Sequence, residues 1–456
     1  MSQVINSEVI YRPDTLPLGS SRQVQYFESS KGVLKQGNRA YITVPNLRNS
    51  FIDTSSAYIQ FTVQNLTLVG TNLPFNSSVY NYNGVGLSSC GAAAFIQSID
   101  ILQNGSLVSR IDNANKINGL LTVANNSNVG TSTTQLTSGN STSLTGAMVA
   151  TPICEYFGKP LAASTATLSI LPSMTFTLNN DLLSFMGDGC MMPISQLKNG
   201  CEIQIQFIND PREAIVMRYG HTCTSATCEF LNVAYVAPIV QLDQSSYDAV
   251  VRDNGFGSRN VIWSGVGYHC STQQLTSAQQ SAAGDYTLLV PNNRFSSLRH
   301  LHVGGFYNQS ATSQEDQCLP RIPFNTLYYR MNGREYPQNR IDTLGKVVLN
   351  TVSCNSSVNN SVGTTLMSST GTTLSDRQAV LGGFQTYAPR GVVGLSLETF
   401  NDTESISGIC VSNTDTEAIL GLSGDAATFD STLGFLSTYD VLYVVSPEGV
   451  LSSSYT

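Results

Sequence analysis

Short runs in which apolar and polar residues alternate recur along almost the whole chain. In Ala40–Val44 and in Tyr58–Val63, every second residue is apolar. Alternation with a period of two places the apolar side chains on one face of an extended strand. Clusters of Gly, Pro, Asn and Ser separate the runs, as turns separate strands. The pattern therefore predicts an all-β protein built from many short strands.

Asn-Gly pairs mark two predicted hairpins. Asn104-Gly105 and Asn332-Gly333 each lie between β-like runs. An Asn-Gly pair tolerates the positive φ angles that a type I′ turn requires. The two pairs are separated by half of the 456 residues, which is the first sign of an internal duplication.

Further features repeat between the two halves. The strand-like segment Tyr41–Pro45 has a counterpart in Tyr286–Pro291. Segments 125–151 and 353–375 are both rich in Ser, Thr, Asn and Gly. They hold too few large apolar residues for a core, so both are predicted to be long exposed loops. The repetition predicts two similar β domains that join near Leu242–Gly257.

Helical patterns are scarce. Asp112–Ala124 is predicted to form a short helix with Asp112 as its N-cap, and Gln244–Arg252 is a second candidate near the middle of the chain. Neither segment is expected to form part of a helical core.

The composition narrows the class of protein. Charged residues make up 12% of the chain, about half of the usual share in a soluble domain, and Ser, Thr, Asn and Gly take their place. Such a surface suits an exported protein, or one whose faces are mostly covered by neighbours. It suits a free cytosolic enzyme less well.

The charge balance argues against direct nucleic-acid binding. The chain carries 23 basic and 31 acidic residues, a formal charge of −8, and no basic run. Non-specific binding to nucleic acid depends on Lys and Arg displacing counterions from phosphates. A chain of this composition is therefore not expected to bind nucleic acid directly.

Neither a signal peptide nor a membrane-spanning run is visible in the sequence. We therefore expect synthesis as a soluble cytosolic product, with the ten cysteines mostly present as buried thiols. The Asn-Xaa-Ser/Thr sequons are about as frequent as chance gives in a chain so rich in these residues. No glycosylation is assigned to them.

One cluster has residue types that bind metals: His221, Cys223, Cys228, His269 and Cys270. A structural zinc site usually shows two close ligand pairs, such as Cys-x2-Cys. Here the two cysteines of the first pair have four residues between them. The adjacent His and Cys lie on a predicted strand, where they would point to opposite faces. The favoured interpretation is free thiols beside a polar loop.

The remaining candidates for chemistry are weaker. His300 and His302 would share one face of a strand, and we interpret them as a polar stripe on an outer face rather than as a metal pair. Trp263, the only tryptophan, is predicted to be a core residue rather than a sugar-stacking platform. The last candidates are three acidic residues, which we interpret as scattered carboxylates in a loop: Glu398, Asp402 and Glu404.

No segment has the pattern of an enzyme site. The glycine-rich segments 83–87 and 255–257 lack the Gly-Lys-Ser/Thr of a phosphate loop, and no Gly-x-Ser-x-Gly nucleophile elbow occurs. The sequence therefore assigns no catalytic residue, no cofactor-binding residue and no metal ligand, and it predicts no cofactor and no enzyme activity.

Seven segments spread over residues 30–456 follow one another in a distinctive order: Gly37–Asn46, Tyr58–Val63, Ser98–Val108, Met192–Phe207, Asn293–Arg299, Leu327–Pro337 and Thr438–Gly449. Each alone could occur in any β protein, but their order across both halves is much harder to reach by accident. In this order the chain resembles the double jelly-roll major capsid proteins of the adenovirus-hexon lineage. It is nearer to the small virophage, polinton-like and adintovirus members than to the longer hexon.

The resemblance implies two tandem eight-stranded jelly-roll sandwiches with few short helices. The first roll would span residues 31–245 and the second 246–456. Three copies would form a pseudo-hexagonal capsomer that tiles the icosahedral shell of a DNA virus. The partners implied are further copies of the chain together with penton and minor capsid proteins, and any membrane beneath the shell would be reached through other proteins.

Residues 1–30 are predicted to be an extended N-terminal arm. They are polar, contain Pro13 and Pro17, and show no clear strand pattern. The arm would become ordered only on assembly, so its deletion is expected to leave trimers intact and to weaken shell formation.

Two other functions remain open at this point. A secreted or surface β-sandwich adhesin or lectin would explain the Ser, Thr and Asn content, although the missing signal peptide counts against it. A glycan-active enzyme on a β-sandwich would need a convergent pair of carboxylates, and no sequence pattern identifies one.

Overall fold

The computed structural model describes most of the chain. The described residues are 20–71, 85–88, 90–124, 162–163, 167–170, 174–178, 180–186, 191–217, 222–255, 257–307, 322–354, 378–381, 384–387, 392–398, 406–412, 415–422 and 430–455. Nearly all of the two low-complexity segments, 125–151 and 353–375, lies outside these ranges, so the prediction of exposed loops there stays a prediction.

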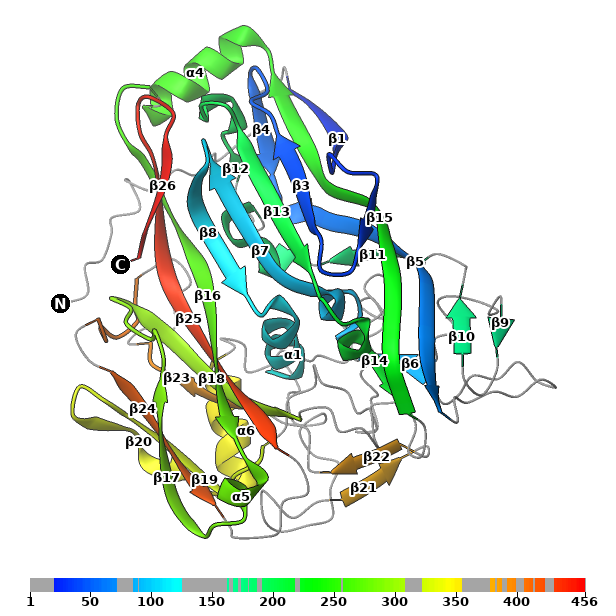
Figure 1. The fold of residues 1–456 in the computed structure, drawn as a ribbon. Helices are drawn as coiled ribbons and strands as arrows, with labels where there is room; N and C mark the ends of the chain where they lie inside the picture. The colour runs from blue at the N-terminus through cyan, green and yellow to red at the C-terminus, as the bar shows by residue number, and fades with distance from the viewer. Residues whose placement is uncertain are drawn as a thin grey trace.

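Short strands dominate both halves, as the alternating pattern predicts (Figure 1). The first half contains β1 (Ser20–Glu28), β2 (Val33–Lys35), β3 (Arg39–Val44), β4 (Ser50–Asp53), β5 (Tyr58–Thr71), β6 (Val85–Leu87), β7 (Ile96–Gln103), β8 (Ser106–Asp112), α1 (Ala114–Ala124), β9 (Ala162–Ala163), β10 (Thr167–Ile170), β11 (Met174–Leu178), β12 (Met191–Met192), β13 (Cys201–Phe207), β14 (Ile215–Met217) and β15 (Thr222–Leu242). Short 3-10 helices lie between them: η2 (Thr54–Ser56), η3 (Gly91–Phe95), η4 (Asn180–Met186), η5 (Ile194–Gln196) and η6 (Pro211–Ala214).

The second half begins after helix α4 (Gln244–Asn254). It contains β16 (Val261–Leu275), α5 (Ser277–Gln280), β17 (Gly284–Val290), β18 (Leu298–Tyr307), β19 (Thr326–Met331), β20 (Arg334–Ile341), α6 (Leu344–Ser353), β21 (Gln378–Leu381), β22 (Phe384–Tyr387), β23 (Val393–Ser396), β24 (Thr416–Leu422), β25 (Ser431–Val445) and β26 (Leu451–Tyr455).

Each half is a sandwich of two antiparallel sheets with the same strand order. In the first half, β1-β15-β5-β11 faces β3-β13-β7-β8, and in the second half β16-β25-β18-β23 faces β17-β24-β19-β20. When the eight strands of each half are numbered 1 to 8 along the chain, the two sheets have the strand orders 1-8-3-6 and 2-7-4-5 in both halves. This is the connectivity of an eight-stranded jelly roll, so the predicted fold class and the predicted duplication are confirmed.

The two predicted hairpins are present at equivalent places in the two rolls. Asn104 and Gly105 join β7 to β8 with φ angles of 51° and 77°, and Asn332 and Gly333 join β19 to β20 with φ angles of 52° and 72°. Both positive angles at both turns are those of a type I′ turn. The segments Tyr41–Pro45 and Tyr286–Pro291 likewise correspond, since β3 and β17 are the second strands of their rolls.

The helix near the middle of the chain is confirmed as α4. Asp243 caps its N-terminus by accepting from the backbone N–H of Ser246, and Gly255 ends it in the left-handed conformation with φ 74°. The N-cap predicted for the earlier helix is wrong. Asp112 is the last residue of β8, and α1 begins after Asn113, whose carbonyl accepts the first helical bonds.

The prediction of an extended arm over residues 1–30 is wrong for the last third of that segment. Ser20–Glu28 form β1, which pairs with β15 along its whole length. The first roll therefore includes residues that the pattern assigned to an arm, and its predicted start at residue 31 is wrong. Residues 1–19 lie outside the described part. A deletion that tests the arm must stop at residue 19, because a longer one removes a strand of the sandwich.

The two rolls meet at a satisfied buried amide. The Gln103 side chain donates to the carbonyls of Lys198 and Gly449, both at 2.9 Å, and accepts from the backbone N–H of Leu451 at 3.0 Å. This places the chain between β25 and β26 against the turn between β7 and β8 (Figure 1). Since Gln103 is 1% exposed, the amide fixes the two rolls to each other without leaving a buried polar atom unpaired.

Candidate functional site

The residues of the predicted metal-like cluster are divided between the two rolls. Cys223 and Cys228 lie in β15, whereas His269 and Cys270 lie in β16; His221 is outside the described residues. Among the described residues, no group of three His, Cys, Asp or Glu side chains is placed to hold a metal ion. Burial raises the pKa of the Cys228 and Cys270 thiols to about 12, so at neutral pH both are protonated and unreactive.

His300 and His302 lie in β18 and are buried, with exposures of 9% and 3%. The interpretation of a polar stripe on an outer surface is therefore wrong. These side chains do point away from the inside of the sandwich, but α6 covers that side of the sheet. Thr351 of α6 accepts from the backbone N–H of Gly394 at 3.0 Å, and Gly394 pairs with His302 in the sheet.

The His302 ring has no hydrogen-bond partner at either nitrogen among the described residues. Burial, with a smaller effect of the neighbouring His300, lowers its pKa from the ordinary 6.5 to about 3. The ring is therefore neutral at physiological pH. The ring and the Sγ of Cys354 both border the space where a Cβ of Gly394 would lie, at 3.1 and 2.9 Å from that position.

Beside the histidines lies a buried ionic cluster. Arg299 Nε donates to Glu398 at 2.5 Å, and the same guanidinium lies 3.7 Å from Asp440. The Arg299 and Glu398 side chains are 8% and 2% exposed. Asp440 also accepts a hydrogen bond from Ser297. The cluster joins β18 and β25 to the chain that follows β23.

The pKa values of the two carboxyls shift in opposite directions. Burial alone would raise the pKa of Glu398, but the contacts with His300, 3.4 Å away, and with Arg299 outweigh it and lower the pKa. For Asp440 burial dominates and the pKa is raised. Glu398 is thus not one of several solvated loop carboxylates, as the sequence pattern suggested; Asp402 and Glu404 lie outside the described residues. Trp263 is 4% exposed and packs on Tyr443, which confirms it as a core residue.

Lowering the pH from 7 to 5 should destabilise the second roll through His302. Its pKa is about 6.5 in the unfolded chain and about 3 in the fold, so the unfolded state binds the proton first. The stabilisation is complete above pH 6.5 and is lost as the pH falls toward 3. At pH 5 the loss is about 2 kcal/mol, which urea unfolding at the two pH values measures.

The matched variant for this test is His302→Leu. Leucine gives up no hydrogen bond, because the ring nitrogens make none, and it cannot be protonated. The variant should lose much less stability than the natural chain between pH 7 and 5. Asp440, with its raised pKa, opposes the effect in both proteins. Equal losses in both would show that another group carries the pH dependence.

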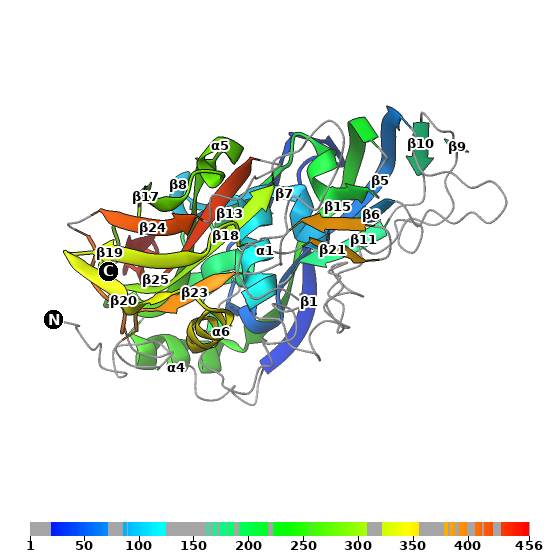
Figure 2. The same ribbon diagram turned by 90° about the horizontal axis from the view of Figure 1, so that it is seen from below.

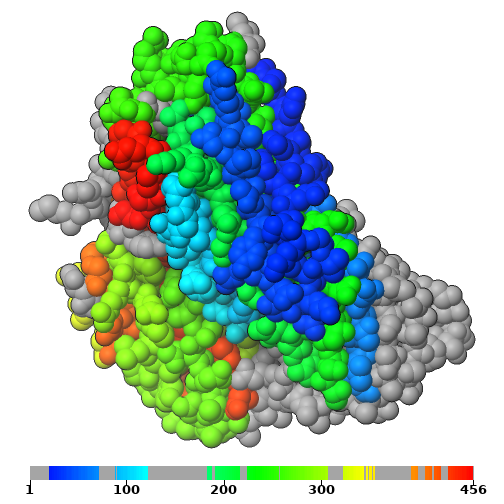
Figure 3. Space-filling view, turned by 45° about the horizontal axis from the view of Figure 1, so that its top comes forward, coloured from blue at the N-terminus to red at the C-terminus, as the bar shows by residue number. Residues whose placement is uncertain are grey.

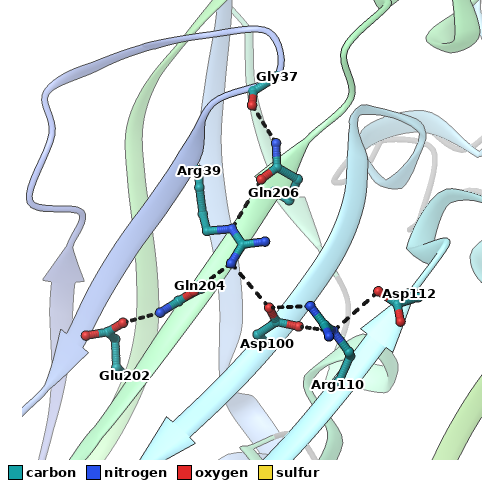
Figure 4. Close-up of polar contacts among 8 residues, drawn as sticks. All are labelled: Gly37, Arg39, Asp100, Arg110, Asp112, Glu202, Gln204 and Gln206. Carbon is teal, nitrogen blue, oxygen red and sulfur yellow. Dashed lines mark hydrogen bonds and ion pairs between the residues drawn. The ribbon is translucent and has the colours of Figure 1, made fainter. Parts of the chain in front are cut away.

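A polar network covers the outer face of the first roll's sheet β3-β13-β7-β8 (Figure 4). Arg39 bridges the strands: it donates to Gln204 at 2.9 Å and to Gln206 at 3.2 Å, and it lies 3.5 Å from Asp100. Arg110 donates to Asp100 from the other side at 3.0 Å. The network is completed by Asp112, Glu202 and the Gly37 carbonyl.

This network has the character of a surface and not of a reaction centre. Asp100, with a side chain 5% exposed, is held between two guanidinium groups, so its carboxylate is fully engaged. None of these residues was singled out from the sequence. The only available signal was the alternation of polar residues along β13, which shows an outer face but not which side chains meet across strands.

No protein-family model matches the chain, and no curated protein matches it. The double jelly-roll fold is nevertheless shared over almost the whole length with viral structures. A chain of the Sputnik virophage, solved by cryo-electron microscopy, has 11% identity and a TM-score of 0.62 over 100% of this chain and 93% of its own.

Two major capsid proteins give the same result. That of Faustovirus has 9% identity and a TM-score of 0.59, covering 96% of this chain and 92% of its own. That of mavirus has 11% identity and a TM-score of 0.57, covering 99% and 93%. At such identities the likeness establishes the fold, and function has to be argued from it.

Proposed function

We propose that this chain is a structural major capsid protein whose trimers are pseudo-hexagonal capsomers that tile an icosahedral virion shell. The observation that carries the proposal is the tandem pair of jelly rolls with one strand order, which aligns over more than nine-tenths of both chains with the Faustovirus and mavirus major capsid proteins. Three such chains supply six similar rolls, which is the number that a hexagonal tile needs.

The surface of the chain fits this role. Its low charge lets large faces meet without the desolvation of many ions, and in the polar network around Asp100 both arginines contact carboxylates. The net charge of −8 fits a shell that does not itself bind the genome. The protein would be made in the host cytosol and act in the virion through its contacts with other copies and with penton and minor capsid proteins, and not as an enzyme.

The alternative of a surface adhesin or lectin has no specific support among the described residues. Trp263, the residue considered as a sugar-stacking platform, is buried. Within the described part of the chain, no helix is long and apolar enough to span a bilayer.

The solution mass tests the proposal. The purified chain should run as a trimer of about three times 49.0 kDa in light-scattering chromatography, and negative-stain images should show hexagonal outlines. A monomer that is retained on a glycan column would overturn the proposal in favour of the lectin alternative.

A further inference from the structure

The His302 imidazole lies in a closely packed contact between helix α6 and the edge of the second roll. A Cβ placed on Gly394 of β23 would lie 3.1 Å from the His302 Cδ2 atom. The same Cβ would lie 2.9 Å from the Cys354 Sγ and 3.1 Å from the Thr351 Cα, both at the C-terminal end of α6. Carbon atoms in ordinary contact are about 3.5–4.0 Å apart. The helix, the edge strand and the imidazole therefore meet without space for a single methyl group.

Helix α6 is attached to the sheet chiefly through β23. The Thr351 hydroxyl accepts from the backbone N–H of Gly394 at 3.0 Å and lies 3.2 Å from the Val392 carbonyl. β23 has four residues and is the edge strand of its sheet, with β18 on its other side. Figure 2 shows α6 beside β23, at the outside of the second roll. The contact of the helix with this edge can therefore break while the strand pairs of the sandwich stay intact.

The surroundings of His302 offer no counterion to a protonated ring. Neither ring nitrogen has a hydrogen-bond partner among the described residues. The neighbouring His300 lies 3.4 Å from Glu398, and Arg299 contacts both Glu398 and Asp440. These two carboxylates are thus engaged by other side chains, while the interaction of His300 with His302 disfavours a positive charge on His302.

The other charged groups on the helices around β18 have partners elsewhere. Lys346 of α6 lies 2.8 Å from Asp342 at the surface. Lys116 of α1 interacts with Glu213 of the first roll. A proton added to His302 would therefore create an unpaired buried charge, which a protein tolerates only when water reaches the ring.

Water can reach the ring most easily from the side of α6. On the inner side of β18, Leu301 and Val303 are fully buried in the core. On the α6 side lies Cys354, whose thiol is uncharged because burial raises its pKa. In the closed contact burial lowers the pKa of His302 to about 3, whereas a solvated imidazole has a pKa of about 6.5. Between these two values, proton binding favours any state in which α6 has moved away and the ring is hydrated.

We propose that mild acidification releases α6 from the edge of the second roll while both sandwiches stay folded, with His302 taking up the proton. The released state is a minor state at neutral pH and becomes more populated in acid. This inference goes beyond a structural role in a shell, because it gives the chain a local response to an acidic compartment. It does not depend on the proposed capsomer.

The reactivity of the Cys354 thiol measures the release, because Cys354 is 4% exposed in the closed contact. The full-length natural chain is treated at pH 7 and at pH 5 with a pyridyl disulfide, which still reacts with thiols in mild acid. Mass spectrometry of the labelled peptides follows each thiol, and each rate is divided by that of free cysteine at the same pH. The pKa values of His302 in the hydrated and closed states predict a normalised rate for Cys354 about twentyfold higher at pH 5.

Cys270 is the matched control thiol in the same roll. It is 3% exposed and lies in β16, which contacts α1, β8 and η4 of the first roll. Figure 3 shows the cyan residues of the first roll against the yellow-green residues of the second. The normalised rate of Cys270 should be the same at both pH values. A Cys354 rate that does not rise, or a rise shared by Cys270, would overturn the local release of α6.

Two substitutions identify the group that takes up the proton. His302→Leu cannot be protonated and gives up no hydrogen bond, so the acid-dependent increase in the Cys354 rate should disappear. His300→Gln keeps a donor for Glu398 but does not titrate, and it should retain the increase. If His302→Leu keeps the increase, or if His300→Gln loses it, the proton is taken up by another group and the proposal is wrong.

Hydrogen exchange of the natural chain tests the release without any variant. After correction for intrinsic rates, the amides of α6 should exchange faster at pH 5 than at pH 7. The amides of α4, a helix of similar length, should show no such change. Equal acceleration in the two helices, or none in α6, would contradict the proposal.

Discussion

Replacing Arg299 by methionine should lower the free energy of unfolding by about 3–5 kcal/mol. The substitution takes the guanidinium away from Glu398, which is buried at 2% exposure and keeps its contact with His300. It also removes the guanidinium that lies 3.7 Å from Asp440. A buried carboxylate that loses its partner keeps the whole cost of its desolvation. Urea unfolding of the natural and variant proteins measures the difference.

The control for this prediction is a second arginine–carboxylate pair whose distance is similar to that between Arg299 and Glu398. Arg294 lies 2.6 Å from Asp415, but the two side chains are 62% and 56% exposed. Arg294→Met should therefore cost at most about 1 kcal/mol. Equal losses for the two variants would mean that burial does not decide the strength of the Arg299 cluster.

The second large effect is expected in the core of the first roll. Phe230 stacks on Phe207 with ring centroids 3.9 Å apart, and its ring meets Phe61 and Phe95 edge-on. All four rings are fully buried between the two sheets. Phe230→Ala removes most of a large side chain from this cluster and leaves a cavity, which should cost about 3–5 kcal/mol.

Two further variants serve as references for the loss of stability expected in Phe230→Ala. Phe230→Leu keeps most of the volume and should cost clearly less than the alanine variant. Leu107→Ala removes an apolar side chain that is 50% exposed, and its effect should stay within about 0.5 kcal/mol. Thermal and urea unfolding would contradict the prediction if Phe230→Ala were no more harmful than Leu107→Ala.

The features that were predicted correctly depend on neighbours in sequence. The Asn-Gly turns at residues 104 and 332 determine their own backbone angles, and the alternation of Arg39–Val44 follows from one buried and one exposed face. The duplicated fold follows from the repetition of such local signals. No long-range contact had to be known for these predictions.

The sequence pattern did not predict the strand β1, and the reason is physical. Alternation appears only where one face of a strand is buried, and Ser21–Tyr26 are exposed on both faces. His300 and His302 show the opposite case. They lie on an outward face, where polar residues are expected, but α6 covers that face, and the packing of a helix over a sheet cannot be read from the strand alone.

The ionic cluster was beyond prediction because its members are far apart in the chain. Arg299 meets Glu398 and Asp440 only after β18, β23 and β25 have paired. A single sequence shows three ordinary charged residues in three segments. Only the fold shows that they share one buried space.

The amide of Gln103 gives the chain a dependence on the order of its synthesis. Two of its three partners, Gly449 and Leu451, are translated long after it, Gly449 following by 346 residues. While the ribosome is still making the second roll, the Gln103 amide of the first roll lacks two of the three hydrogen-bond partners that it has in the complete chain. We therefore expect the first roll to reach its final stability only when residues 449–451 have left the ribosome. In nascent chains the first roll should be less stable than in completed chains.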